Sequence, residues 1–289
     1  MPELPEVEVV RSGLAPAVIG AQIMSVAVFD ERALTRHPAG AADFVAQLEG
    51  DRIVAASRRG KFLWLPLARG VTALTAHLGM SGQMLLRAPD APPERHERIR
   101  IGVQHPQHGD LAVVFADQRT FGSLAVDGLV TDGADLVPTQ VRHIARDPLD
   151  LAFDDHAFIA SVRRRSSAVK RILLDQTIIS GVGNIYADES LWAARIHPET
   201  HGRALSAQAV GRLLGEVRLV LEKALAEGGT SFDAQYVNVN GEAGYFAHSL
   251  NAYGRGGEPC ARCGGEIRRE SFMNRSSHYC PRCQRKTSR

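Results

Sequence analysis

The cysteines constrain this chain most strongly, because all four lie within the last thirty of its 289 residues. They form two Cys-x-x-Cys pairs, Cys260 with Cys263 and Cys280 with Cys283. Such a pair presents two thiolates from one tight turn, and two facing pairs make a tetrahedral cage that suits Zn²⁺. Two redox pairs or a disulfide staple are the alternatives, although a chain of this length buries a core without a staple. We therefore predict one structural zinc ion with no coordination position open for chemistry.

The residues around these cysteines are basic. Residues 251–289 contain nine Lys/Arg and only three Asp/Glu, whereas the whole chain has a net charge of +2. Arginines gathered on a small metal-held module indicate a phosphate-binding surface. A solvated basic tail is the alternative, and it is the weaker one because a zinc framework would hold the arginines in a fixed register.

Hydropathy patterns predict a β-rich first half and a helical second half. A Pro–Glu start predicts a helix over residues 5–20. Short β-type runs follow at 23–29, 52–56, 62–67, 71–77, 83–86, 99–103 and 111–116. Their spacing and turn residues indicate an antiparallel sandwich or barrel. Apolar periodicity then predicts helices at 153–165, 168–176, 184–195 and 206–227, before a Gly-rich loop at 229–249.

These patterns predict a multidomain α and β protein. We expect an N-terminal domain at residues 1–132, a connector at 133–150, a helical domain at 151–249 and the zinc module at 250–289. The acidic N-terminus is unlike a secretion signal, and no apolar run has membrane-spanning length. A soluble cytoplasmic protein without a membrane partner is therefore expected.

Two short segments could carry function, since the common nucleophile, nucleotide and metalloprotease motifs are absent. One is the Gly-rich turn at 181–183, which precedes the predicted N-cap Asn184 and a helix start that could bind an anion. The other is the N-terminus. Removal of Met1 would expose the secondary amine of Pro2 beside Glu3, and such an amine is partly unprotonated at neutral pH because its pKa lies near ~8. It could attack a sugar C1′ to form an iminium ion, but most Met-Pro starts carry no chemistry.

A set of motifs runs along the chain in a fixed order. They are Pro-Glu-Leu-Pro-Glu-Val-Glu at 2–8, Arg-Gly-Lys at 59–61, His-Leu-Gly-Met-Ser-Gly at 77–82, residues 117–122, Gly-Val-Gly-Asn-Ile-Tyr-Ala at 181–187, and the four cysteines. In this order the chain resembles, over essentially its whole length, the formamidopyrimidine-DNA glycosylases, bacterial base-excision enzymes that remove 8-oxoguanine and ring-opened purines. The resemblance implies an N-terminal antiparallel β-sandwich with a flanking helix, a helix–two-turn–helix domain and a four-cysteine zinc finger.

The resemblance implies the catalytic roles. Pro2 would be the nucleophile that forms a Schiff base, and Glu3 the acid/base at the deoxyribose, a role that a pKa raised by burial would suit. Lys61 would contact the phosphate of the damaged nucleotide and donate a proton in β-elimination, whereas its plain alternative is a solvated strand lysine. Arg275 would act in δ-elimination. Glu6 would orient the helix start or would only complement the helix dipole.

The resemblance also implies contacts to the DNA backbone. His77 and Asn184 would bind the extruded phosphates together with the catalytic lysine and arginine. His96, Arg165 and Lys170 would make further DNA contacts, with Lys170 near the lesion.

A third group of residues would replace the flipped nucleotide in the base stack. Met80, Arg119 and Phe121 match the family's wedge, and Arg119 would hydrogen-bond the orphaned cytosine. Met80 and Phe121 could otherwise be ordinary core residues. The chain has Gln118 and Thr120 where the family more often has proline and a second arginine, so the contact of that arginine is left unassigned.

The leading hypothesis is a bifunctional DNA glycosylase and AP lyase that removes oxidised purines, with a lid over the damaged base at about residues 230–245. It would bind duplex DNA containing oxidised purines or abasic sites, act as a monomer, and lie with the nucleoid in the cytoplasm. The rivals are the endonuclease VIII type, which removes oxidised pyrimidines, and a non-catalytic zinc-finger protein. The wedge residues favour the purine enzyme, and intact Pro2, Glu3 and Lys61 argue against the non-catalytic protein.

Overall fold

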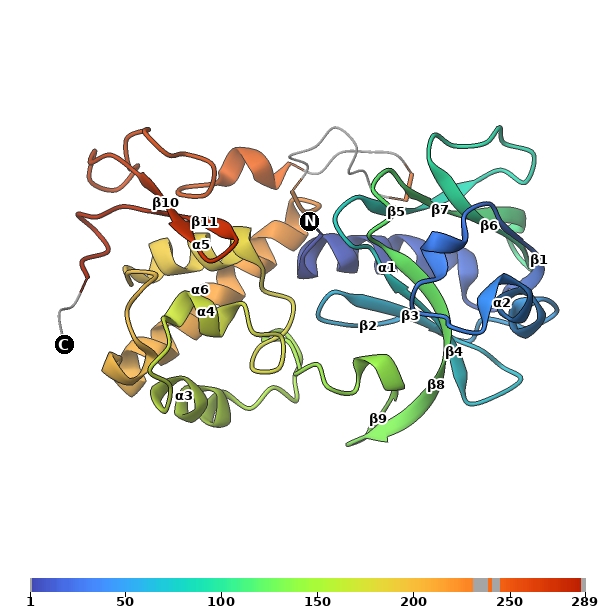
Figure 1. The fold of residues 1–289 in the computed structure, drawn as a ribbon, viewed down its shortest axis with the longest axis horizontal. Helices are drawn as coiled ribbons and strands as arrows, with labels where there is room; N and C mark the ends of the chain where they lie inside the picture. The colour runs from blue at the N-terminus through green and yellow to red at the C-terminus, as the bar shows by residue number, and fades with distance from the viewer. Residues whose placement is uncertain (1, 231–238, 241–244, 287–289) are drawn as a thin grey trace. The chain divides into compact units, whose positions relative to one another are not determined.

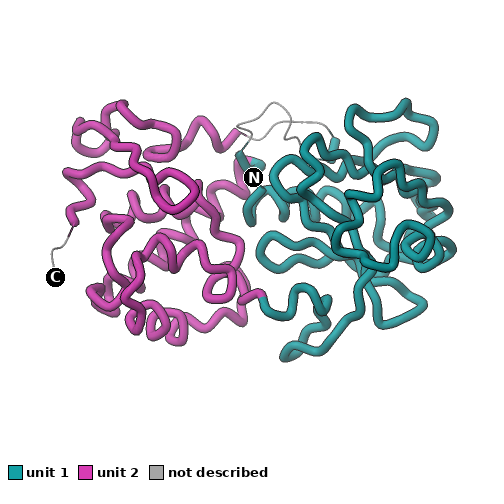
Figure 2. Tube along the Cα trace, viewed as in Figure 1, with its two compact units in different colours: residues 1–143, 228–244 teal, residues 144–227, 245–289 magenta. Residues whose placement is uncertain are grey.

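A computed structural model describes residues 2–230, 239–240 and 245–286 of the chain. These residues belong to two compact units (Figure 2). Unit 1 consists of residues 1–143 and 228–244, and unit 2 consists of residues 144–227 and 245–289. The described residues of the Gly-rich loop before residue 245 therefore belong with the β-rich part of the chain, although sequence patterns group this loop with the helices.

Unit 1 is built on two antiparallel β-sheets (Figure 1). The four-stranded sheet has the order β1-β6-β7-β5, and the five-stranded sheet has the order β2-β3-β4-β8-β9. The strands are β1 (Gln22–Val28), β2 (Ser57–Arg59), β3 (Phe62–Pro66), β4 (Thr72–His77), β5 (Gly82–Arg87), β6 (Glu97–His105), β7 (Gly109–Asp117), β8 (Ser123–Asp132) and β9 (Asp135–Pro138). Every neighbouring pair is antiparallel, as the sequence predicts.

Both sheets share one hydrophobic core with helix α1 (Leu4–Val18). On β6, the buried residues Ile99, Ile101 and Val103 alternate with more exposed ones, so one face of the strand points into the core. Helix α1 adds Val10 and other apolar residues of its buried stripe to the same core. The helix is thereby anchored to the sandwich, together with the N-terminal segment that it carries.

Three features of unit 1 differ from the expectation. Within residues 52–56, only Arg52 and Ile53 pair, as isolated bridges in place of a strand. Helix α2 (Gly40–Leu48) is an addition, because its nine residues offer only a short window in which to recognise a helical pattern. Strand β8 is not among the predicted runs, because its second half is half-exposed and lacks alternation, and strand β9 lies in the segment expected as a connector.

Unit 2 combines helices with the cysteine-rich hairpin. Its elements are α3 (Asp155–Arg163), α4 (Val169–Leu173), α5 (Asn184–Ala194), α6 (Ala207–Ala226), β10 (Arg268–Phe272) and β11 (Arg275–Tyr279). Short 3₁₀ helices lie at η1 (Glu31–Leu34) and η2 (Thr139–Val141) in unit 1, and at η3 (Gly202–Ala204) and η4 (Phe246–Ser249) in unit 2. Helix α6 is capped as predicted, since the Ser206 hydroxyl accepts the Ala209 N–H at 3.1 Å. None of the helices that the structure describes is long and apolar enough to cross a bilayer.

Candidate active site and nucleic-acid interface

The start of helix α1 buries the predicted catalytic pair, Pro2 and Glu3. Glu6 also lies inside, and its Oε2 accepts the Glu3 N–H at 2.8 Å in a capping-box arrangement. Its Oε1 accepts the N–H and the hydroxyl of Thr230 at 2.8 and 2.9 Å. Glu6 therefore does more than complement the helix dipole. It joins the N-terminal segment to the first residue of the loop expected to form the lid.

Close packing at this junction requires a glycine. Gly229 has a φ of +81°, and a Cβ there would lie 3.0 Å from Glu6 Oε1. A side chain at this position would therefore strain the backbone and press on the carboxylate that holds Thr230.

Lys61 lies in the tight turn between β2 and β3, where Gly60 has a φ of +57°. Arg58 connects this turn to helix α1, because its guanidinium binds Glu8 Oε2 at 3.0 Å and the Gly60 carbonyl at 3.2 Å. Burial raises the pKa of Glu8, but hydrogen bonds from Arg11 and Arg58 outweigh it and lower the pKa overall. The helix that carries the N-terminal pair and the turn that carries Lys61 are thus linked by one carboxylate.

His77 ends strand β4 beside this turn. Burial, with the positive charges of Arg36 and Lys61, lowers its pKa to about 4, so the ring is neutral at physiological pH. Its Nδ1 accepts the Gly79 N–H at 3.2 Å, which places the ring proton on Nε2. The ring also packs at 4.8 Å from Phe62. His77 is therefore an uncharged donor close to two cations.

The three wedge residues lie on two exposed loops, 78–82 and 118–122. Met80 and Phe121 have exposed fractions of 45% and 62%, and Arg119 is also exposed, so none of them is a core residue. The loops touch, because a Cβ on Gly79 would lie 2.5 Å from the backbone of Phe121. The side chains that the resemblance assigns to the vacated stack therefore come from adjacent turns of one surface.

Asp117 organises these loops and was not singled out by sequence reasoning. It is 1% exposed, and its carboxylate accepts the Ser81 hydroxyl at 2.5 Å, the Arg119 N–H at 3.1 Å and the Gly122 N–H at 2.7 Å. Its own N–H donates to the His96 carbonyl at 2.9 Å, which places His96 beside the wedge. A single buried carboxylate thus fixes both loops.

In unit 2, one face of helix α5 binds the cysteine-rich module. Asn184, Asp188 and Trp192 are spaced four residues apart and therefore share that face. Asn184 Nδ2 donates to the Ser276 carbonyl at 3.1 Å, and Asp188 Oδ2 accepts the His278 N–H at 2.8 Å. Gly183 occupies the N-cap position, so the expectation that Asn184 caps the helix is wrong by one residue. The four-residue spacing is the sequence signal that could have revealed this face.

The structure corrects the expected place of Lys170. Its side chain is 0% exposed, and Nζ lies 2.6 Å from Asp188 Oδ1. The same ammonium donates to the Ser276 carbonyl and the Ser277 hydroxyl, both at 2.9 Å. Because an unpaired buried ammonium is costly, helix α5 and the finger surround it with acceptors. Lys170 therefore lies in the interior of unit 2 and not on its surface.

The remaining two predicted DNA contacts of unit 2 are half-exposed. Arg165 donates to the carbonyl and hydroxyl of Ser161, one turn earlier in the chain. Arg275 begins strand β11 after a two-residue hairpin turn, and among the described residues the only hydrogen bond of its side chain is to Asn274 Oδ1 at 3.2 Å. The Arg275 guanidinium therefore keeps most of its donors for another partner.

The four cysteines form the predicted metal centre. Their sulfur atoms all lie within 4.8 Å of one another. Tetrahedral Zn–S bonds of about 2.3 Å put the sulfurs roughly 3.8 Å apart, so this donor set fits zinc. Trp192 Nε1 donates to Cys260 Sγ at 3.4 Å, and Arg262 stacks over the indole at 4.0 Å. Burial opposes ionisation of Cys260, but the indole and backbone N–H groups prevail and lower its pKa to about 6.

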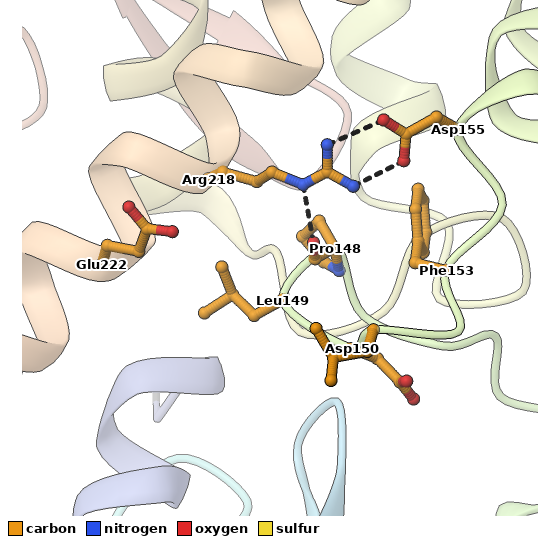
Figure 3. Close-up of a pocket in the computed structure, with 8 residues that line it drawn as sticks. Pro148, Leu149, Asp150, Phe153, Asp155, Arg218 and Glu222 are labelled. Carbon is orange, nitrogen blue, oxygen red and sulfur yellow. Dashed lines mark hydrogen bonds and ion pairs between the residues drawn. The ribbon is translucent and has the colours of Figure 1, made fainter.

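A pocket of about 490 Å³ in unit 2 has no part in this constellation (Figure 3). Its central cation, Arg218, already donates to the Asp155 carboxylate and the Pro148 carbonyl. Phe153 and Glu222 complete the wall beside it. The guanidinium is therefore already engaged by the protein, and none of the predicted site residues lines the pocket.

Three family descriptions match consecutive parts of the chain. They are the formamidopyrimidine-DNA glycosylase N-terminal domain at residues 1–124, the formamidopyrimidine-DNA glycosylase H2TH domain at 144–235, and the zinc finger found in FPG and IleRS at 257–285. These matches confirm the predicted combination of a β domain, a helix–two-turn–helix domain and a four-cysteine finger.

Curated relatives agree with these matches. A formamidopyrimidine-DNA glycosylase of Leifsonia xyli subsp. xyli is 61% identical over 296 residues, which cover 99% of this chain and 100% of the relative. The same enzyme of a Nocardioides species is 60% identical and covers 98% of this chain and 94% of its own length.

Solved structures of Lactococcus lactis FPG are similar throughout. A complex of a variant with Fapy-dG-containing DNA has a TM-score of 0.86 at 32% identity and covers 99% of this chain and 100% of that chain. A complex with DNA containing an abasic site has a TM-score of 0.84 at 32% identity, with 98% and 100% covered. A third, with DNA containing an oxidised pyrimidine, has a TM-score of 0.84 at 32% identity, with 99% and 100% covered.

Proposed function

We propose a catalytic assignment for this chain on the premise that it belongs to the formamidopyrimidine-DNA glycosylase family, as its matched domains and relatives establish. It is accordingly a base-excision repair DNA glycosylase acting on damaged DNA, and AP lyase activity is typical of the family. We assign oxidised purines in duplex DNA, and abasic sites, as its substrates. The observation that carries the assignment is the buried pair Pro2 and Glu3, held in place by Glu6.

Pro2 is the nucleophile of the proposed reaction. After Met1 is removed, its secondary amine attacks C1′ of the flipped nucleotide, and the C1′–base bond breaks as the base leaves with a proton. The C1′–O4′ bond of the sugar then breaks as the ring oxygen takes a proton, which leaves an iminium ion at C1′. This ion withdraws electrons, so a C2′ proton is lost and the 3′ phosphate departs in β-elimination. A second elimination expels the 5′ phosphate, and hydrolysis frees the amine. Glu3 is assigned to protonate the sugar ring oxygen and to exchange protons during these steps.

Phosphate groups of the flipped nucleotide are assigned to four donors. Lys61 supplies charge, and neutral His77 donates its Nε2–H without adding charge. Asn184 has one N–H of its amide committed to Ser276 and a second N–H left on the same nitrogen. Arg275 supplies several N–H donors from the hairpin. A zinc ion bound by all four cysteines would hold this hairpin together and would have no open coordination position.

The wedge is the proposed basis of purine selectivity. Met80 and Phe121 are exposed apolar side chains that can enter the vacated stack, and Arg119 can hydrogen-bond the opposite cytosine. The Lactococcus lactis complex with an oxidised pyrimidine makes pyrimidine lesions the second candidate substrate. We further propose that the chain acts as a monomer at the nucleoid in the cytoplasm.

Borohydride trapping tests the assignment. We expect the protein without Met1 to form a covalent adduct with an 8-oxoguanine:cytosine duplex, and to form less with a thymine-glycol duplex. Protein that retains Met1 should give none, because its secondary amine is blocked, whereas Pro2→Gly should retain weak trapping through its primary amine. Absence of an adduct with both duplexes contradicts the enzyme assignment, and preferential trapping on thymine glycol favours the pyrimidine reading.

A further inference from the structure

Lys170 and Asp188 form a buried ion pair with no solvent access. Their side chains are 0% and 1% exposed, and the charged atoms are 2.6 Å apart. Removing two charges from water is unfavourable, and apolar residues of similar volume often serve stability equally well. A pair retained at this cost is best explained by the geometry that it imposes on its neighbours.

The neighbours of the pair are three consecutive residues of strand β11. Lys170 Nζ donates to the Ser276 carbonyl and the Ser277 hydroxyl at 2.9 Å. Asp188 Oδ2 accepts the His278 N–H at 2.8 Å and lies 3.1 Å from the His278 Nδ1. These three residues follow Arg275 directly in the sequence. The pair therefore fixes the backbone immediately after the arginine assigned to the DNA phosphate.

The opposite arm of the hairpin is held by the same ammonium. Lys170 Nζ lies 5.2 Å from the centre of the Phe272 ring, and Phe272 is the cross-strand partner of Arg275. An ammonium over an aromatic face is attractive, more so when both are desolvated. Both arms at the Arg275 end are thus tied to one buried charge.

We propose that the Lys170–Asp188 pair is a positioning device that sets the placement of Arg275, and that Lys170 does not contact DNA or the lesion. The inference rests on the proposed phosphate role of Arg275. Its physical basis is that an ammonium has three directed protons, which match the carboxylate, carbonyl and hydroxyl acceptors around it. A shift of about 1 Å in a group that binds the transferring part of a substrate can cost roughly 100-fold in rate.

The test removes the pair without leaving a lone buried charge. Lys170→Met alone would strand the Asp188 carboxylate, so the informative variant is Lys170→Met with Asp188→Asn. The matched control is Arg218→Met with Asp155→Asn, which removes an ion pair of the same unit that does not contact the hairpin. One bound zinc per chain, measured by atomic absorption, verifies that the finger of each variant is assembled.

Hydrogen exchange of residues 275–279 reads the hairpin independently of catalysis. We expect faster exchange there in the Lys170→Met/Asp188→Asn protein and unchanged exchange in the control. Affinity for an abasic-analogue duplex should fall by about 10-fold or more, and so should the ratio of β,δ-elimination to β-elimination product. The fraction of the protein that still binds DNA should still be trapped by borohydride through its N-terminal amine. Unchanged exchange and unchanged affinity would overturn the proposal.

A double-mutant cycle with Arg275→Ala separates the proposal from its premise. If the pair acts through Arg275, the pair substitution should add little to the loss already caused by Arg275→Ala. Full additivity, or a loss for 8-oxoguanine that an abasic site does not share, would assign Lys170 a direct lesion contact and overturn the proposal. If Arg275→Ala by itself changes neither affinity nor product ratio, the assigned role of Arg275 fails instead, and faster exchange would still mark the pair as the anchor of the hairpin.

Discussion

At the scale of single residues, Glu6 is an example of one carboxylate with three simultaneous tasks. It accepts the Glu3 N–H and both the N–H and hydroxyl of Thr230, so each of its oxygens is used. Glutamine in its place would turn an NH₂ group toward a donor, and a donor facing a donor makes no bond. Loss of this hydrogen bond would loosen the connection between the start of helix α1 and Thr230, the first residue of the loop expected to form the lid.

Glu6→Gln should therefore lower the free energy of unfolding by about 2 kcal/mol, since hydrogen bonds to charged groups contribute more than neutral ones. Urea denaturation measures the change. Thr230→Val is the matched control, because it removes only the hydroxyl and should cost about 1 kcal/mol. Equal stability of Glu6→Gln and the parent protein would contradict this account.

His77 gives stability a specific pH dependence. Burial and the charges of Arg36 and Lys61 hold its pKa at about 4, below the value near 6.5 of an unfolded chain. The unfolded state therefore binds more protons between these two values. The contribution of His77 is full above pH 6.5 and declines as the pH falls toward 4, by at most about 1.4 kcal/mol per pH unit.

Comparison of the parent protein with His77→Gln isolates this contribution, because all other titrating groups are shared. Between pH 7.5 and 4.5, the unfolding free energy of the parent should fall more steeply than that of the variant. An NMR titration should find the ring still neutral at pH 5.5. Identical slopes, or protonation near the ordinary histidine pKa, would rule the argument out.

At the scale of elements, the wedge depends on how Asp117 joins two loops. Its buried carboxylate binds Ser81 in one loop and Arg119 and Gly122 in the other. An exposed methionine and an exposed phenylalanine can act together only if their turns keep a fixed spacing. The spacing is set by hydrogen bonds at the loop bases and not by packing of the two side chains themselves.

Asp117→Asn should therefore slow base flipping more than it weakens overall DNA binding. The amide would set an NH₂ group against one of the N–H donors, and loss of a buried bond to a charged acceptor costs about 2 kcal/mol. The increase in 2-aminopurine fluorescence on extrusion of the lesion measures flipping. Ser81→Ala removes one of the bonds and should have a smaller effect in the same direction. Normal flipping by Asp117→Asn would refute the link between the loops.

The elements that sequence analysis predicts well are those whose signal is local. Helix α6 shows a long apolar stripe and a serine cap, and β6 shows alternation, so both are predicted close to their observed bounds. Strand β9 and helix α2 are short, so their local patterns are too brief to define them without tertiary pairing or packing.

Within the candidate site, too, local sequence signals identify some residues, whereas the contacts that position them depend on the tertiary fold. Motifs identify Pro2 and Lys61 by residue type, but the ties that position them come from residues far away in the sequence, such as Arg58 to Glu8. Lys170 shows the limit most clearly. Its charge and motif predict a DNA contact, and only the fold reveals that Asp188 and the hairpin enclose it.

At the scale of the whole molecule, the proposed reaction uses both compact units. The nucleophile and Lys61 belong to unit 1, whereas Asn184, Arg275 and the four cysteines belong to unit 2. The zinc module contacts α5 through Asn184, Asp188 and Trp192, so metal loss should disturb unit 2 first. Unit 1 has its own core and shares none of these contacts, and it should keep its fold.

The two tryptophans make this prediction measurable, because Trp64 is buried in unit 1 and Trp192 contacts Cys260 in unit 2. In a Trp64→Phe protein, chelation of zinc should shift the Trp192 emission to longer wavelength as the indole loses its sulfur and Arg262 contacts. In a Trp192→Phe protein, the Trp64 emission should stay unchanged while DNA affinity is lost. Re-addition of zinc should restore the Trp192 emission and the DNA affinity. Undiminished DNA binding by the metal-free protein would show that the finger does not present Arg275, and a shifted Trp64 emission would show that the fold of unit 1 depends on the metal.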